Sequence, residues 1–382
     1  MEVCVNPKQI AEQRFSEVEE DLKSISHWMY EHPETAFQEF ATSAKLAGYL
    51  AQHGFVVDYP AYGLDTAFVA RAGSHGPEVV ICAEYDALPG VGHACGHDII
   101  ATASMGAGLA LAGLADELGF RVTVLGTPAE EMKGGKVDLI NAGAFETASV
   151  SMMIHPSPYN VLDPSVLAVR HVDLEYRGKD SHAAGAPEKG INALDAFVQA
   201  YVNVATLRQQ ILPSDRLHGI ITHGGDAPNI IPSYTRSSWY IRAATKERLE
   251  ELTEKVMACF EAASIATGCT WKTSEIGHPY EDLVNNPVLV ELFDRNASAL
   301  GRTMARGVDM PKAGSTDMGN VSHLIPAIHP FLSINCGEAV NHQPEFAAAT
   351  ITPDGDKAIR DGALAMAWTV IDLATENRWG EL

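Results

Sequence analysis

Six residues with metal-binding side chains follow predicted strands at four separate places along the chain. They are Cys95 and His97 in VGHACGHD (residues 91–98), Glu130 and Glu131 after FRVTVLGTPA, His155 after SVSMMI, and His342 in the loop after AIHPFLSIN. Thiolate, imidazole and carboxylate together form the ligand set of zinc and similar divalent ions. Because four loops contribute, the pattern favours a catalytic metal site over a short structural zinc knuckle.

Each of these residue types also has an ordinary structural interpretation. A lone buried cysteine is usually a small hydrophobe, and paired glutamates before a helix usually interact with its N-terminus. A lone loop histidine is usually solvated or caps a helix, the interpretation that we prefer for His53, His75, His278 and His329. The coincidence of a Cys-x-His, a Glu-Glu pair and two further histidines at strand ends is what favours the metal site.

A thiol nucleophile at Cys95, with His97 as its base, is a second interpretation of the same stretch. It ranks below the metal site because it leaves the two glutamates and the two later histidines without a role. Gly92 and Gly96 flank Cys95, and we expect them to let the backbone turn tightly enough to aim Cys95 and His97 at one spot.

Strands that alternate with helices must position these residues. The first part of the chain predicts amphipathic helices over residues 9–30 and up to Gly54, then strands at TAFVARAG, EVVICAEYD, FRVTVLGTPAEE and SVSMMIHP separated by helical runs. This order predicts an α/β fold with a mainly parallel sheet covered by helices. Ligands bind beyond the carboxyl ends of strands in such sheets, which is where the six residues would meet.

The chain changes character after Pro164. Residues 169–280 predict strand–helix–strand–strand–helix–strand, the split βαβ pattern of a small α+β sandwich. Helix–strand alternation resumes afterwards. We therefore predict a catalytic domain in two parts, 1–168 and 281–382, with an inserted α+β lid or dimerisation domain over 169–280.

The composition of the chain limits the classes of partner that it is expected to bind. The chain has 382 residues and a formal net charge of −22, and it lacks clusters of Lys and Arg. This argues against nucleic acid and against an anionic membrane surface. We find neither a signal peptide nor an apolar stretch of about 20 residues, and the six scattered cysteines suit a reducing, cytoplasmic compartment.

Several motifs, in order along nearly the whole chain, resemble one known family. They are AEYDALPG, GHACGHD, GTPAEE, SHAAGAPEKGINALDA, GGDAPNIIP and STDMGN with NHQPEF. They are similar to the co-catalytic metallopeptidases that include aminoacylases, carnosinases and glutamate carboxypeptidases. Within that family they resemble the amidohydrolase branch, in which a cysteine replaces a metal-binding aspartate.

The resemblance implies a role for each matching residue. Two divalent ions, Zn or Mn with Co as a further option, would be held by Cys95, His97, Glu131, His155 and His342, with Cys95 bridging. Glu130 would be the general base, Asp86 would orient the ligands, His182 would act on substrate in its own or the partner subunit, and Asn229 and Arg242 would bind substrate.

The expected reaction is hydrolysis of an amide bond in an N-acyl amino acid or dipeptide, such as a p-aminobenzoyl-glutamate-like or β-alanyl dipeptide-like substrate. The family also implies a homodimer. Two other classes remain open: a non-catalytic protein that holds metal on the same fold, and an acyl transferase that depends on Cys95.

Overall fold

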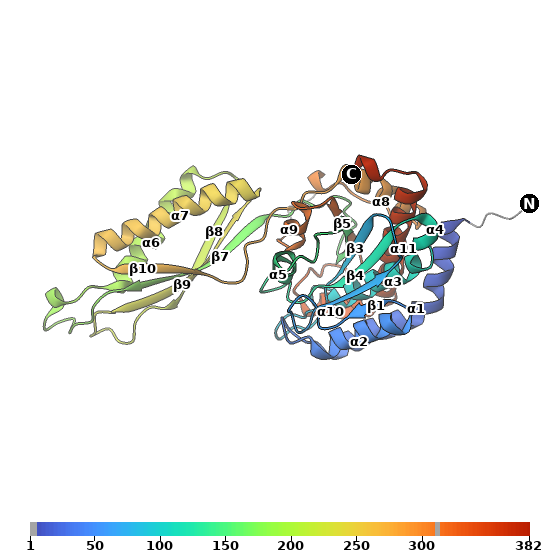
Figure 1. The fold of residues 1–382 in the computed structure, drawn as a ribbon. Coiled ribbons are helices and arrows are strands. Elements are labelled where there is room, and N and C mark those ends of the chain that lie inside the picture. The colour runs from blue at the N-terminus through green and yellow to red at the C-terminus, as the bar shows by residue number, and fades with distance from the viewer. Residues whose placement is uncertain (1–5, 310–313) are drawn as a thin grey trace, which may run out of the picture. The chain divides into compact units, whose positions relative to one another are not determined.

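The chain folds into two compact units (Figure 1). The computed structural model describes residues 6–309 and 314–382. Unit 1 comprises the described residues of 1–165 and 283–382, and unit 2 comprises residues 166–282. The boundaries that the sequence predicts, at 168/169 and 280/281, lie within three residues of these limits.

Unit 1 has an α/β fold around a mainly parallel sheet of six strands, in the order β1-β2-β4-β3-β5-β11. The strands are β1 Val56–Asp58, β2 Phe68–Ala72, β3 Glu78–Ala83, β4 Arg121–Gly126, β5 Ala148–Met152 and β11 Ala327–Ile328. Strand β3 is parallel to β4 and β5, and β5 is parallel to β11. Strands β1 and β2 add an antiparallel edge, which the sequence did not predict.

Helices cover both faces of this sheet. They are α1 Pro7–Glu31, α2 Phe40–Gln52, α3 His97–Ala112, α4 Ala115–Leu118, α5 Gly135–Asn141, α8 Pro287–Ala299, α9 Met318–Ser322, α10 Pro344–Thr350 and α11 Pro353–Thr375. Strand β3 is buried along its whole length. Val79 and Ile81 belong to the core of α1, α3 and α11, whereas Val80 and Cys82 belong to the core of α5 and α9. A continuous apolar run is what a strand covered on both faces requires.

Two of the predicted strands are interrupted. SVSMMIHP forms β5 and then β6 (His155–Ser157), and AIHPFLSIN forms β11 and then β12 (Phe331–Ser333). Strands β6 and β12 pair with each other in a separate parallel sheet. His155 therefore begins a strand of the small sheet rather than ending a strand of the large one.

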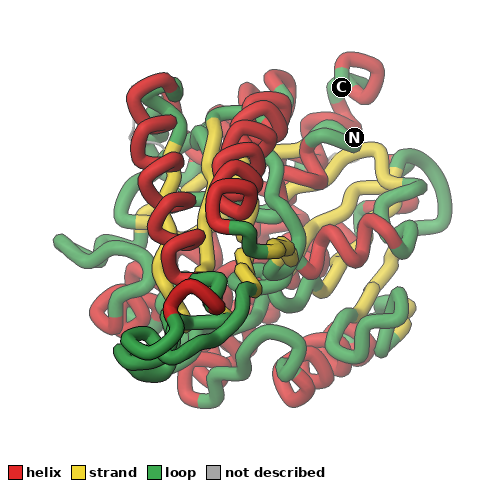
Figure 2. The backbone as a smooth tube through the Cα atoms, turned by 90° about the vertical axis from the view of Figure 1, so that its left-hand side faces the viewer, coloured by secondary structure: helices red, strands yellow, loops and turns green. Residues whose placement is uncertain are grey.

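Unit 2 is an antiparallel sheet with two helices on one face (Figures 1 and 2). Its strand order is β10-β7-β9-β8, formed by β7 Ala168–Arg177, β8 Arg216–His223, β9 Tyr234–Ala243 and β10 Thr270–Glu275. Helices α6 (Ala193–Leu207) and α7 (Lys246–Thr267) pack against each other and against β7 and β9. The side chains of Asn192 and Thr245 cap their N-termini, as these residue types favour.

Four short 3-10 helices complete the described elements: Pro187–Lys189, Arg208–Gln210, Gly307–Asp309 and Trp379–Glu381. Among residues 6–309 and 314–382, no helix is both long enough and apolar enough to cross a membrane.

Candidate metal centre

The loop between β3 and α3 carries Cys95 into the interior of unit 1, and His97 is the first residue of α3. Gly92 and Gly96 adopt positive φ angles of 69° and 80°, as expected for a tight turn around Cys95. Gly96 also lies against β6, because a Cβ atom at Gly96 would come 2.3 Å from Pro156 Cγ. The turn that bears Cys95 and the strand that bears His155 are therefore in direct contact.

The five predicted metal ligands gather at one place in two overlapping groups. One group is Cys95, His97 and His155, and the other is Cys95, Glu131 and His342. Within each group the candidate ligand atoms all lie within 4.8 Å of one another. The Sγ atom of Cys95 lies 3.5 Å from His155 Nε2 and 3.6 Å from His342 Nε2. Cys95 is thus the member that the two groups share.

The donor atoms fit a pair of bound cations. His97 Nε2 and Glu131 Oε1 are buried and have no hydrogen-bond partner among the described residues. They lie 3.7 Å apart, and buried polar atoms are normally satisfied. An ion between them would satisfy both, and the mixed sulfur, nitrogen and oxygen set suits zinc, manganese or cobalt.

The remaining nitrogens of two histidines are held by neighbouring oxygens. Asp86 Oδ1 lies 3.1 Å from His97 Nδ1, and Asp86 Oδ2 accepts a hydrogen bond from the Glu131 backbone N–H. His155 Nδ1 lies 2.7 Å from the Pro156 carbonyl oxygen. Partners of this kind fix the tautomer so that Nε2 offers its lone pair to a metal. Asp86 therefore contacts two of the predicted ligands.

Glu130 lies beside this group and is itself buried, with 7 % of its surface exposed. Burial, together with Glu84 and Glu131, raises its pKa well above the ordinary value of a glutamate. A carboxyl whose pKa is raised can hold a proton that it has accepted, which is what a general base requires before it donates that proton again.

The environment of Cys95 disfavours the nucleophile interpretation. Burial and the charge of Glu131 raise the pKa of its thiol well above the ordinary value. Reactive cysteines have lowered pKa values, whereas coordination to a cation deprotonates even a buried thiol. The surroundings of Cys95 thus suit a metal ligand.

The comparisons with known proteins agree with this geometry. Residues 80–361 match the profile of peptidase family M20/M25/M40. The chain belongs to this family. It is 40 % identical to the Xaa-Arg dipeptidase of Mus musculus, over 96 % of this chain and 88 % of the mouse protein. It is 29 % identical to one of the polypeptides of the Escherichia coli p-aminobenzoyl-glutamate hydrolase, over 64 % and 56 % of the two chains.

Solved structures of the M20 fold superpose on nearly the whole chain. A dinuclear metal-binding M20 peptidase from Bacillus subtilis matches with a TM-score of 0.72 and 20 % identity, over 93 % of this chain and 99 % of that one. The aminobenzoyl-glutamate utilization protein of Klebsiella pneumoniae gives 0.73 and 18 %, over 94 % and 97 %. The chain is therefore an M20 hydrolase of carbon–nitrogen amide bonds, with the fold that its sequence predicts.

The M20 site contains three buried charged residues to which sequence reasoning assigned no role. They are Glu84, Lys136 and Asp317, and Lys136 pairs with both of the others. Glu84 also forms a further group of possible ligands with His97 and Glu130. Glu84 directly follows β3, the same strand-end signal that identified Asp86. Nothing in the local sequence distinguishes Lys136 from a solvated helix residue.

His329 corrects one expectation. We expected a solvated or helix-capping residue, but its side chain is 1 % exposed and its ring centroid lies 5.5 Å from that of His155. Burial and the neighbouring His155 lower its pKa well below the ordinary value. His53, by contrast, does lie at the C-cap of α2, where its Nδ1 atom is 2.8 Å from the Tyr49 carbonyl oxygen.

The three predicted substrate residues of this M20 chain lie in unit 2. His182 and Asn229 are neighbours and exposed, and the Ala183 backbone N–H donates to the Asn229 carbonyl oxygen. His182 Nδ1 accepts hydrogen bonds from the backbone of Ala184 and Gly185, so a neutral ring carries its proton on Nε2. Arg242, on β9, is half-buried, and its guanidinium lies 5.8 Å from the centroid of the Tyr240 ring.

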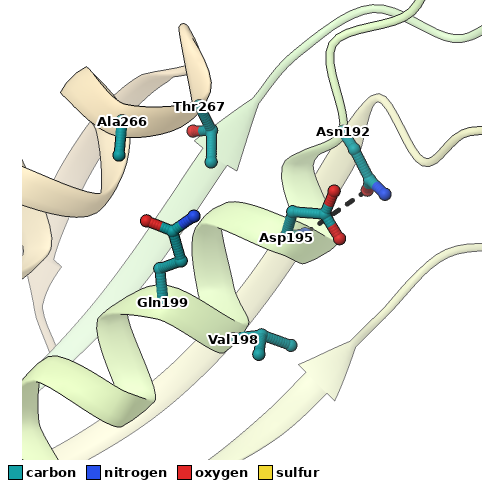
Figure 3. A pocket seen from close by; sticks show the side chains of 6 residues that line it. All are labelled: Asn192, Asp195, Val198, Gln199, Ala266 and Thr267. Carbon is teal, nitrogen blue, oxygen red and sulfur yellow. Dashed lines mark hydrogen bonds between the residues drawn. The ribbon is translucent and has the colours of Figure 1, made fainter.

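A surface cavity of about 360 Å³ lies elsewhere in unit 2, between the start of α6 and the end of α7 (Figure 3). It is lined by Asn192, Asp195, Val198, Gln199, Ala266 and Thr267. It contains none of the predicted site residues, and its lining has neither a metal-binding group of three side chains nor a base beside a nucleophile. We assign it no part in the chemistry.

Proposed function

We propose that this M20 enzyme hydrolyses dipeptides and related N-acyl amino acids with two divalent ions, zinc or manganese, with cobalt also accepted. Cys95 would bridge the ions, with His97 and His155 on one side and Glu131 and His342 on the other. The observation that carries this proposal is the pair of ligand groups that share Cys95. Side chains grouped in this way could hold two neighbouring cations, which would supply Lewis-acid chemistry and activate water.

The protein residues would divide the reaction between them. When bound, the ion pair polarises the scissile carbonyl and makes water a stronger nucleophile. Glu130 takes the proton of the attacking water and hands it to the leaving amine. His182 donates from Nε2 to the oxygen on which negative charge develops, consistent with its two backbone donors at Nδ1.

Arg242 and Asn229 would recognise the substrate. A guanidinium presents two parallel N–H groups to a carboxylate, so Arg242 favours a substrate with a free carboxyl group next to the cleaved bond. Asn229 adds an amide beside His182. The M20 relative in mouse is an Xaa-Arg dipeptidase, and this supports a dipeptide with a basic C-terminal residue as the first substrate to test.

A substrate panel tests the proposal. Metal-free protein is reconstituted with Zn²⁺, Mn²⁺ or Co²⁺ and assayed on Xaa-Arg and Xaa-Lys dipeptides, β-alanyl dipeptides, N-acyl-glutamates and N-acyl aliphatic amino acids. We expect metal-dependent release of the C-terminal amino acid. Binding of two ions without turnover of any of these compounds would favour the non-catalytic metal-holding protein.

Chelation separates the proposal from a Cys95-dependent acyl transferase. Removal of metal should abolish hydrolysis, and added ions should restore it. Activity that survives chelation but not thiol alkylation would favour the transferase instead.

We also propose that unit 2 mediates a homodimer. Strand β8 is an edge of its sheet, with Ile220 and Ile221 exposed. Helix α6 exposes Val198, Tyr201 and Val202. An exposed edge strand with apolar side chains invites pairing with a second copy. Sedimentation of the wild type and of Ile220→Glu tests this, with a dimer expected only for the wild type.

The unpaired cysteines support a reducing, cytoplasmic location for the protein. The five cysteines in the described part of the chain are all unpaired. Such a compartment would keep Cys95 available as a ligand, and separation of cell fractions with an activity assay tests this placement.

A further inference from the structure

Lys136 is a wholly buried lysine that the mechanism above does not use. It is the second residue of α5, and its side chain is 0 % exposed. Its Nζ atom is paired with Glu84 Oε1 and lies 2.7 Å from Asp317 Oδ1. Its backbone N–H also donates to Asp317 Oδ2 over 2.9 Å. A buried ammonium is tolerated only where it is paired, so these three residues form one unit, the buried triad.

The buried triad joins three segments of unit 1 that border the metal centre. Glu84 comes two residues before Asp86, and Lys136 comes five residues after Glu131. Asp317 stands at the N-terminus of α9. The triad therefore connects the loop after β3 with the loop after β4, and each of these loops carries site residues.

Glu84 connects the triad to the predicted ligands. One of its oxygens, Oε1, is bound to Lys136, and the other, Oε2, lies 3.4 Å from His97 Nε2. Neither Glu84 Oε2 nor His97 Nε2 has a hydrogen-bond partner among the described residues. Glu84, His97 and Glu130 each offer an atom within 4.8 Å of the others. Glu84 thus faces a ligand nitrogen and the proposed base at once.

The charges around Glu84 require a counterion. Glu84 lies close enough to Glu130 and Asp317 for its charge to raise the pKa of each of them, and such carboxylates repel. If the ammonium were absent, Glu84 could turn both oxygens toward His97 Nε2 and compete there for the proton or for the cation. Because Lys136 holds Oε1, the Glu84 carboxylate is restrained from turning both oxygens toward His97.

We propose that Lys136 is a positioning residue of the metal centre: its ammonium holds Glu84 so that His97 Nε2 stays open to a metal ion and Glu130 stays directed at the reacting water. This inference rests on the proposed two-metal function. The competing explanation is that the buried triad only stabilises unit 1.

Two variants separate these explanations. Lys136→Met leaves two buried carboxylates unpaired, so it should unfold at a lower temperature under either explanation. The triple variant Lys136→Met/Glu84→Gln/Asp317→Asn removes all three charges at nearly constant volume and should regain much of the lost stability. Metal-free protein is then measured by thermal unfolding, by Zn²⁺ competition with a chelating dye, and by kinetics after reconstitution.

We expect the folded triple variant to bind the more weakly held of its two Zn²⁺ ions about tenfold less tightly than the wild type does. Its kcat should fall by about a hundredfold, because small misplacements of reacting groups have effects of that size, while KM changes by less than about threefold. Lys8→Met is the matched control, since Lys8 pairs with the buried Asp372 and, among the described residues, contacts none of the site residues. It should leave Zn²⁺ affinity and kcat unchanged.

A triple variant that folds with wild-type Zn²⁺ affinity and wild-type kcat would overturn the positioning role. A triple variant that does not fold would assign the buried triad to stability and overturn it as well. Failure of the proposed function itself is recognised separately, because the wild type would then bind no metal pair or hydrolyse no amide.

Discussion

The Nδ1 atom of His97 lies 3.1 Å from Oδ1 of Asp86, and both side chains are completely buried. A carboxylate accepts only, so His97 donates through Nδ1 and turns the lone pair of Nε2 toward Cys95 and Glu131. Asp86→Asn weakens this bond and removes the charge that makes the imidazole a better ligand. We expect metal affinity to fall by about 10–100-fold, measured by competition with a chelating dye. Unchanged affinity would show that Asp86 only packs beneath the site.

The base is tested by Glu130→Gln. An amide cannot accept the proton of the attacking water, so kcat should fall by about 10²–10⁴-fold, while elemental analysis should still find two metal ions per chain. Glu131→Gln is the neighbouring control, because it should lose metal as well as activity. Near-normal turnover of a metal-loaded Glu130→Gln protein would remove Glu130 from the mechanism.

The bridging role is tested by Cys95→Ser. A hydroxyl is a much poorer ligand than a thiolate, and Cys95 belongs to both ligand groups. We therefore expect the variant to lose at least one ion per chain on dialysis, as counted by elemental analysis. Cys336→Ser, at a half-buried cysteine outside both groups, should keep both. Two ions retained by Cys95→Ser would count against a bridge.

Substrate recognition is tested by Arg242→Ala with a substrate pair, a free acid and its primary amide. The wild type should prefer the acid, because the guanidinium fork matches a carboxylate. In the variant the preference should shrink by about 2–4 kcal/mol, with metal content unchanged. Arg236→Ala is the control on the same strand, since Arg236 pairs with Asp173. If the variant prefers the acid over the amide as strongly as the wild type does, Arg242 has no role in binding the carboxylate.

Stability should depend on pH through Glu39. Burial and the charge of Asp86 raise its pKa to about 7, and its Oε1 atom accepts from the Ala129 N–H just before Glu130. The folded protein keeps this proton at pH values at which the unfolded chain has released it. The contribution of Glu39 to the free energy of unfolding is therefore complete below about pH 4.5. This contribution is lost as the pH rises to about 7, and the free energy of unfolding falls by at most about 3 kcal/mol.

Urea unfolding of the metal-free protein at pH 5 and pH 8 measures this effect. Glu39→Gln mimics the protonated side chain and should be less sensitive to pH than the wild type. Glu31→Gln, at an exposed position, should behave like the wild type. If Glu39→Gln retains the full pH dependence, another group is responsible.

The sequence predicted that these side chains would gather at one place, because the ends of strands carry a local signal. An apolar run that stops at a polar residue marks the edge of a buried sheet, and this located Cys95, His97, Glu131 and His155 before any geometry was known. The exact placement differed, since His155 starts β6 of a small second sheet. A single apolar run does not reveal where a strand leaves one sheet for another.

Residues that are buried by distant parts of the chain carry no such signal in their local sequence. Lys136 and His329 look like solvated residues in their local sequence, yet both are enclosed by segments far away along the chain. Asp317, for example, meets Lys136 across 181 positions. The antiparallel edge formed by β1 and β2 was missed for a related reason, because strand direction depends on the path of the connecting loops.

The contact between Gly96 and Pro156 has a further consequence. The turn that carries Cys95 and the strand that carries His155 touch through a bare backbone and one rigid ring, so hard-sphere contact limits how closely they can approach. Packing inside unit 1 therefore contributes to the spacing between the donor atoms of Cys95 and His155. Widening this contact by one methyl group, as in Gly96→Ala, would alter the spacing between donors and with it the preference among ions of different radius.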